Sequence, residues 1–171
     1  SGFRGVLDYA LGKDDARIVG GNMSGLLSRE LAHEFSAARA LRPDVDRPVW
    51  HTSLAAAPGE KLSDDQWRDL AESFMRGMGF GPTTQFIVVR HASGEERNTP
   101  IGKGPTTEHV HIIASRVDLN SELWHGQWEV RKAIELTQQL EKDLGLIQTK
   151  GLDAERPQKK KASKAEIERS E

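Results

Sequence analysis

The sequence predicts an α+β fold, in which an antiparallel β-sheet of about four or five strands carries helices packed mainly on one of its faces. Segments with apolar residues at helical spacing alternate along the chain with short strand-like runs. The strand-like runs alternate polar and apolar side chains, as half-exposed antiparallel strands do. The chain has 171 residues, of which 36% are hydrophobic, so it is long enough to form one domain with its own core.

The helices are predicted from apolar spacing together with residues that start or stop a helix. The first begins near Phe3 and is stopped by Gly12, and the glycines at 20 and 21 then predict a turn. Ser28 and Ser63 are expected to cap the second and third helices, because a serine hydroxyl accepts a hydrogen bond from a free amide of the first turn. The last helix is expected over 128–144. The residues expected on the buried faces of the last three helices are Leu31, Phe35, Ala38, Leu41, Trp67, Leu70, Phe74, Met78, Val130, Ile134, Leu140 and Leu144.

Three strands are predicted from runs rich in β-branched and aromatic residues. They are expected at Val49 to Leu54, at Gln85 to Arg90, and from His109 to about Val117, with the last one central in the sheet. A polar loop over 92–107 separates the second from the third. From Gln148 the chain is charged and has few apolar residues, so we expect one domain over 1–147 and a flexible charged linker or tail over 148–171.

Two histidines in the last predicted strand indicate a metal site. Because side chains alternate along a strand, His109 and His111 are expected to project on the same side, about 6 to 7 Å apart. His91 ends the preceding strand. If both other strands are neighbours of the histidine strand, these three histidines line one polar patch together with His51 and Ser53. For His-Val-His alone, an ordinary polar alternation on a solvent-facing strand is the alternative interpretation.

The composition excludes several classes of site. The chain has no cysteine, which rules out disulfides, thiolate metal sites and cysteine nucleophiles, so a metal would bind through histidine and carboxylate. No segment is long and apolar enough to span a bilayer, and we expect a soluble protein. The net charge of -2 does not by itself favour a polyanionic partner. Because the sequence opens at Ser1 instead of methionine and ends in a charged stretch, we expect it to be part of a longer chain.

The order of the motifs resembles that of the P-class plasmid relaxases, within the HUH endonuclease superfamily. The matching segments are Val-Leu-Asp-Tyr at 6–9, His-Thr-Ser-Leu-Ala-Ala-Ala-Pro-Gly-Glu at 51–60, Val-Val-Arg-His at 88–91 and Glu-His-Val-His-Ile-Ile-Ala-Ser-Arg-Val at 108–117. The resemblance covers roughly residues 3 to 147. Without it, the single tyrosine, Tyr9, would be interpreted as a packed ring with its hydroxyl at the surface.

The resemblance implies a relaxase that nicks one DNA strand at an origin of transfer for conjugative mobilization. Tyr9 matches the family's nucleophile, which attacks the scissile phosphate and stays joined to the 5′ end of the DNA. His91, His109 and His111 match the ligands of a divalent ion, and Ser53 matches a serine that places the DNA beside the nucleophile. The ion polarises the phosphate, which a weak nucleophile such as tyrosine needs. An all-imidazole set suits Mn²⁺ better than Mg²⁺, but Mg²⁺ is the abundant cellular ion, so the metal stays open.

The sequence departs from the family pattern near the first metal histidine. Alanine and serine follow His91 where the family has a carboxylate, and 17 residues separate this histidine from His109 instead of a short loop. The family's first strand would lie before the start of this sequence. The candidates for orienting a metal-bound imidazole are Glu95, Glu108 and His51.

The remaining expectations concern partners and alternatives. Arg4, Arg116 and the loop over 92–107 are the predicted DNA contacts, because an acidic chain must concentrate cations where it binds DNA, and the loop is expected to become ordered on binding. The implied partners are single-stranded origin DNA, accessory relaxosome proteins and a coupling protein, in the bacterial cytoplasm and without a membrane. A rolling-circle replication initiator is one alternative, although initiators generally place tyrosine after the histidines. The other is a DNA-binding module that keeps the fold without cutting.

Overall fold

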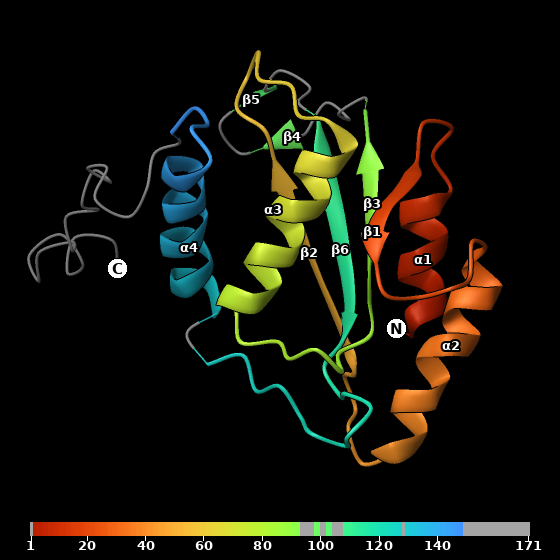
Figure 1. Ribbon diagram of the computed structural model, residues 1–171. Helices are drawn as coiled ribbons and strands as arrows, with labels where there is room; N and C mark the ends of the chain where they lie inside the picture. Colours follow the sequence, from red (N-terminus) through yellow and green to blue (C-terminus); the bar gives the residue numbers. More distant parts are fainter. Residues whose placement is uncertain (1, 93–97, 100–101, 104–107, 128, 149–171) are drawn as a thin grey trace, which may run out of the picture.

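The central element of the molecule is a four-stranded antiparallel sheet with the strand order β1-β3-β6-β2 (Figure 1). The computed structural model describes residues 2–92, 98–99, 102–103, 108–127 and 129–148. The strands of the sheet are β1 (Arg17–Gly21), β2 (Val49–Ala55), β3 (Phe86–His91) and β6 (His109–Ser115). The predicted α+β class, the antiparallel sheet and the inner position of the histidine strand are therefore confirmed.

Helices cover both faces of this sheet, which corrects the expectation that they pack mainly on one. The helices are α1 (Phe3–Leu11), α2 (Ser28–Leu41), α3 (Asp64–Gly77) and α4 (Glu129–Asp143). α1 and α2 pack against the face that presents Val89 and Ile113, whereas α3 packs against the face that presents Val110 and Ile112. Figure 1 shows α3 lying across the strands of the sheet, while α1 and α2 lie next to each other at the right of the view. The physical reason is β6, because all seven of its residues are buried and both of its faces therefore need cover.

The start of α3 follows the sequence prediction, but the start of α2 does not. The Ser63 hydroxyl accepts a hydrogen bond from the Gln66 amide at 3.1 Å, and the Gln66 side chain accepts one from the Ser63 amide at 2.8 Å. Ser28, in contrast, is the first helical residue of α2. The Glu30 carboxylate accepts hydrogen bonds from the backbone amides of residues 26 and 27 at 3.0 and 3.2 Å. It therefore satisfies two backbone donors that precede the helix, which a serine cap would leave to water.

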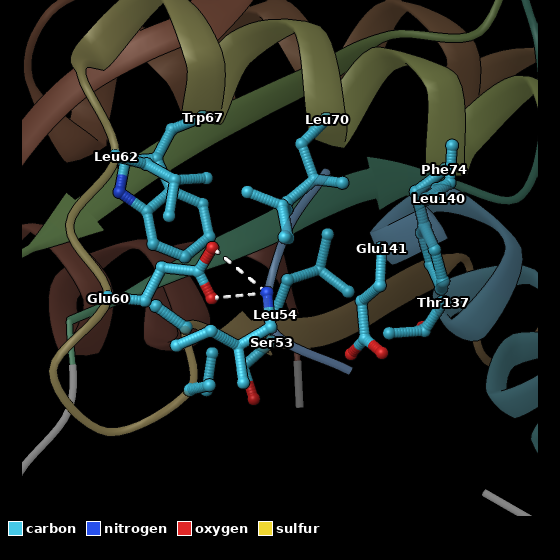
Figure 2. A pocket seen from close by; sticks show the side chains of 15 residues that line it. Ser53, Leu54, Glu60, Leu62, Trp67, Leu70, Phe74, Thr137, Leu140 and Glu141 are labelled. Atoms are coloured by element: carbon cyan, nitrogen blue, oxygen red, sulfur yellow. Dashed lines mark hydrogen bonds between the residues drawn. The ribbon is translucent and has the colours of Figure 1, made fainter. Parts of the chain in front are cut away.

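Less of the surface of α4 is buried than its apolar spacing predicted. Val130 and Leu144, both expected to be buried, are 74% and 50% exposed. Only a stripe that includes Leu140 packs against the α3 side of the core. A pocket remains between this helix, α3 and β2, and Figure 2 shows it with the Glu60 carboxylate accepting the Ile147 amide, at 3.1 and 3.2 Å. α4 therefore lies at the margin of the domain, where part of its apolar pattern faces solvent.

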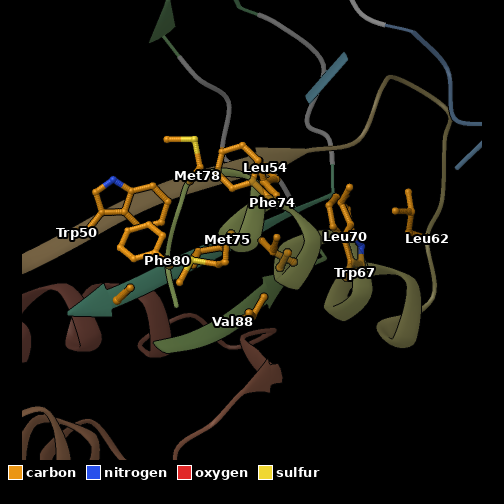
Figure 3. Packing of buried hydrophobic residues seen from close by; sticks show 14 residues of the cluster. Trp50, Leu54, Leu62, Trp67, Leu70, Phe74, Met75, Met78, Phe80 and Val88 are labelled. Carbon is orange, nitrogen blue, oxygen red and sulfur yellow. The ribbon is translucent and has the colours of Figure 1, made fainter. Parts of the chain in front are cut away.

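The core on the α3 side fixes which residues of β6 face the site. Trp67 is fully buried and Phe74 is 1% exposed, and Figure 3 shows both packed with Val88 of the sheet. Val110 and Ile112 belong to the same cluster. Because side chains alternate along a strand, the odd-numbered residues of β6, which include the two histidines, must face the opposite side.

Strand β1 was missed by the sequence prediction, which interpreted its glycines as a turn. β1 pairs with β3 through an irregularity between Ile18 and Gly20, and Gly21 has a φ of 119°, which a residue with a side chain rarely adopts. Within the segment predicted as a polar loop, β4 (Asn98–Thr99) pairs with β5 (Gly102–Lys103). Residues 93–97, 100–101 and 104–107 of that loop and the tail over 149–171 lie outside the described residues. No helix in the described part of the chain has the length and apolarity that crossing a membrane requires.

Candidate metal and nucleophile site

Strand pairing brings the three predicted metal histidines together on one side of the sheet. The register of β3 with β6 places His91 opposite His109 and Val89 opposite His111. All three histidines are buried, and one ring nitrogen from each lies within 4.8 Å of one from the others. The ring centroids are separated by 4.5 to 5.0 Å. The histidine patch predicted from strand parity is thus a compact three-imidazole cluster.

The donors of this cluster fit a divalent metal ion. With imidazole bonds of about 2.0 to 2.1 Å, two nitrogens on one ion lie at most about 4.2 Å apart, so the side chains need only small rotations to share it. Nε2 of His91 lies 2.6 Å from the carbonyl oxygen of Ala10, and Nδ1 of His111 lies 2.9 Å from Nε2 of His51. Metal-bound histidines commonly donate their second ring N–H in this way. The residues present therefore fit an ion held through Nδ1 of His91, Nε2 of His111 and a nitrogen of His109.

His51 and Ser53 lie on the same face as the cluster, as predicted. The register of β2 with β6 places Ser53 directly opposite His111, and His51 two residues further along. Partial burial lowers the pKa of His51, because desolvation disfavours the charged imidazolium. Its neutral form is able to accept a hydrogen bond through one ring nitrogen.

Tyr9 lies at the edge of the histidine cluster. Buried residues of α1, including Phe3 and Leu7, pack on α2 and the sheet, with Phe3 stacked on Phe35 at a centroid distance of 4.2 Å. This packing leaves Tyr9 half exposed, with its ring edge-on to that of His111 at 5.7 Å between centroids and 84° between planes. A phenolic oxygen is therefore accessible to a substrate beside a site that can hold a cation.

A family model described as "Relaxase: MobA/VirD2-like, nuclease domain" matches residues 9–146. The chain belongs to this relaxase family. The match starts at Tyr9 and spans all three cluster histidines. Comparisons with curated proteins and with solved structures gave no significant match. As a member of the family, the chain carries a relaxase nuclease domain that acts on DNA, and its buried histidine triad can hold the metal ion on which relaxases depend.

Other residues predicted for the relaxase site are not gathered with the histidines. Arg4 is exposed on α1 and pairs with Asp8 at 2.9 Å. Arg116 follows the opposite end of β6 from His109, and its guanidinium donates to the carbonyls of Trp124 and Arg47 at 3.2 and 3.0 Å. These two backbone carbonyls hold the Arg116 side chain away from the histidine cluster. A third predicted residue, Glu95, lies outside the described residues.

Glu108 is engaged on the other face of the sheet. Its carboxylate accepts a hydrogen bond at 3.0 Å from Arg90, whose guanidinium also contacts Asp64 at 2.5 Å. Arg90 lies between Val89 and His91, so its side chain projects to the α3 face. The pair with Glu108 joins the end of β3 to the residue before β6, next to His91 and His109, and the pair with Asp64 joins β3 to the first residue of α3.

Two elements of the site were missed by sequence reasoning. The Ala10 carbonyl, which holds His91, is a backbone atom with no signature in the residue type. Arg90 did carry a signal, because it interrupts the apolar face of a strand one residue before a metal histidine. An arginine at such a position requires a buried acidic partner, and Glu108 is the acid nearest the paired strand.

Proposed function

We propose that this chain nicks one strand of DNA at an origin of transfer by tyrosine transesterification, and that it does so for conjugative mobilization. The observation that carries the proposal is the juxtaposition of Tyr9 with the three-histidine cluster, at 5.7 Å between the rings of Tyr9 and His111. Membership of the relaxase nuclease family supports the same chemistry and favours it over a replication initiator. We further propose that residues 1–147 form the nuclease domain and that 148–171 act as a linker.

Tyr9 is the nucleophile of the proposed step. Its phenolic oxygen attacks the scissile phosphorus, so that an oxygen–phosphorus bond forms while the bond to the 3′ oxygen breaks. The phenolic proton passes to solvent or a neighbouring base, and the 3′ oxygen takes up a proton to become a free hydroxyl. One phosphodiester replaces another, so the reverse reaction reseals the strand. In the proposal Ser53 contacts the DNA backbone beside the nucleophile, and its position opposite His111 supports this role.

His91, His109 and His111 would hold the divalent ion, Mn²⁺ or Mg²⁺. When bound, the ion supplies positive charge that polarises the phosphate and stabilises the charge of the transition state. The protein's part is to fix three imidazoles in a buried, preformed arrangement, so that little reorganisation is needed during the reaction. In the proposed complex Arg4 and the loop over 92–107 contact the DNA, and accessory relaxosome proteins and a coupling protein are the further partners.

The decisive experiment is a search for a covalent adduct. The protein is incubated with Mn²⁺ or Mg²⁺ and single-stranded oligonucleotides tiled across the DNA that flanks its own gene, then separated on a denaturing gel. We expect a protein–DNA adduct with one oligonucleotide. Tyr9→Phe removes only the hydroxyl, so it should abolish the adduct while melting temperature and DNA affinity stay near the parent values.

Histidine variants provide the matched control. His109→Ala should also abolish the adduct, whereas His33→Ala, at an exposed position of α2, should not. An adduct formed by Tyr9→Phe at the parent rate would refute the nucleophile assignment. A parent protein that binds one oligonucleotide tightly but never forms the adduct would instead indicate the non-cleaving DNA-binding module.

A further inference from the structure

We propose that His51 is a positioning residue for the metal ligand His111. Nε2 of His51 lies 2.9 Å from Nδ1 of His111, and the ring centroids are 5.1 Å apart. Nothing in the family match assigns a role to His51. The inference rests on the proposed metal site, and it extends that proposal by naming the group that orients one ligand.

The backbone explains why these two rings meet. β2 pairs with β6 at seven successive positions, which place His51 opposite Ile113 and Ser53 opposite His111. His51 is thus the diagonal neighbour of His111 on the same face of the sheet. Diagonal pairs are separated by about 7 to 8 Å between Cα atoms, which is within reach of aromatic side chains. The contact therefore follows from the register of two well-paired strands.

The hydrogen bond selects the tautomer of His111. If Nδ1 of His111 carries the proton and donates a hydrogen bond to Nε2 of His51, then Nε2 of His111 is unprotonated and its lone pair can bind a metal ion. In the other tautomer the proton sits on Nε2 of His111 and blocks that lone pair. An acceptor at the position of His51 therefore favours the tautomer that binds metal, as second-layer partners of metal histidines do.

A different role for His51, as the proton acceptor of Tyr9, has less support in the geometry. The ring of Tyr9 contacts His111 edge-on, and the ring of His51 is hydrogen-bonded to the same residue. His51 thus acts on the site through His111. The two roles predict different measurements, because a positioning residue changes metal binding in the absence of DNA and a proton acceptor does not.

The test uses Co²⁺ as a spectroscopic probe of the full chain. The dissociation constant is measured by titration of the visible absorption band, with a chelator as competitor. His51→Phe keeps a ring but removes the acceptor, so it should weaken Co²⁺ binding about 10- to 100-fold and alter the band. His51→Gln returns a carbonyl oxygen and should recover most of the affinity. His125→Phe, at an exposed position, is the matched control and should equal the parent.

The outcomes separate this inference from the proposed function. Parent-like Co²⁺ affinity and spectrum in His51→Phe would overturn the positioning role, and a slower adduct formation in that variant would then indicate the proton acceptor. Equal losses in His51→Phe and His51→Gln would also overturn it, because the acceptor would not be the feature that matters. Failure of the parent to bind Co²⁺ would overturn the inference as well, because there would be no metal site for His51 to support. The Co²⁺ measurements that decide the positioning role contain no DNA, so the nicking activity stands or falls on the adduct experiment.

Discussion

Replacing Arg90 by methionine should destabilise the fold far more than the same replacement at Arg68. Both guanidiniums bond two carboxylates: Arg90 contacts Asp64 and Glu108, and Arg68 contacts two acids of its own helix at 3.2 and 3.3 Å. The arginine side chains differ in environment, since that of Arg90 is 11% exposed and that of Arg68 is 41% exposed. Methionine keeps the apolar stem in each case, so the comparison isolates the charge.

The magnitude follows from what the substitution leaves behind. Removing one partner of a fully buried ion pair costs about 3 to 5 kcal/mol, whereas exposed pairs are worth about 0 to 1 kcal/mol. Glu108 is 20% exposed, so water can partly solvate its abandoned carboxylate, whereas Asp64 is 44% exposed and keeps its ion pair with Arg17 at 2.9 Å. Nε of Arg90 is buried without a hydrogen-bond partner, and its removal is a small gain. We therefore expect a loss of about 2 kcal/mol for Arg90→Met and about 0.5 kcal/mol or less for Arg68→Met.

Urea unfolding followed by tryptophan fluorescence measures both free energies of unfolding in one assay. A decrease in the midpoint without a change in the slope would report lost stability and not a changed denatured state. If the two variants lost equal stability, the burial of the Arg90 pairs would make no difference to the free energy of unfolding. The inference that these pairs hold β3 to the start of β6 and to α3 beside the histidine cluster would then be wrong.

Three further predictions follow from burial, charge and the predicted DNA contacts. Trp67→Ala should cost about 3 to 5 kcal/mol, because the ring is fully buried, while Val130→Ala should change the free energy of unfolding by about 0.5 kcal/mol or less. Burial raises the pKa of Asp64 but hydrogen bonds from two arginines outweigh it and leave the pKa lowered, so Asp64→Asn should lose stability above about pH 4. That loss should vanish as urea midpoints are taken toward pH 2, and a pH-independent loss would contradict the assignment. Arg97→Ala with Lys103→Ala should reduce the slope of DNA affinity against salt by about two, and identical slopes would show that these residues make no phosphate contact.

Strand parity was enough to predict that His109 and His111 share a face, because side-chain alternation depends only on local geometry. His109 and His111 must share a face in any strand, and the single uncertain step was whether β2 and β3 flank β6. The pairing confirms that they do, so His51 and Ser53 join the same face. The contact of His91 with the Ala10 carbonyl was not predictable, since it depends on how α1 packs over the sheet.

The errors in the fold prediction have one cause: a local sequence pattern does not show which other elements of the fold pair with a segment or pack over it. Gly20 and Gly21 favour a turn, yet pairing with β3 holds them in an edge strand. The polar positions of β6 suggested a solvent-facing side, but α1 and α2 cover it beside the histidines. Val130 has the spacing of a core residue and is exposed, because α4 lies at the margin of the domain.

One face of β6 packs in the core that stabilises the fold, and the other face carries the histidines of the candidate metal site. Val110 and Ile112 pack with α3 in the larger core, while His109 and His111 lie on the opposite face, where the ring of Tyr9 from α1 contacts His111. The ligands are buried on a strand whose other face is locked into that core, so the site is preformed and does not depend on a loop to assemble it. Substitutions at the even positions should therefore act through stability, whereas those at the histidines should act on metal binding in a protein that still folds. The sheet thus separates the two properties by residue parity, and a loss of function can be attributed to one or the other from the position of the residue alone.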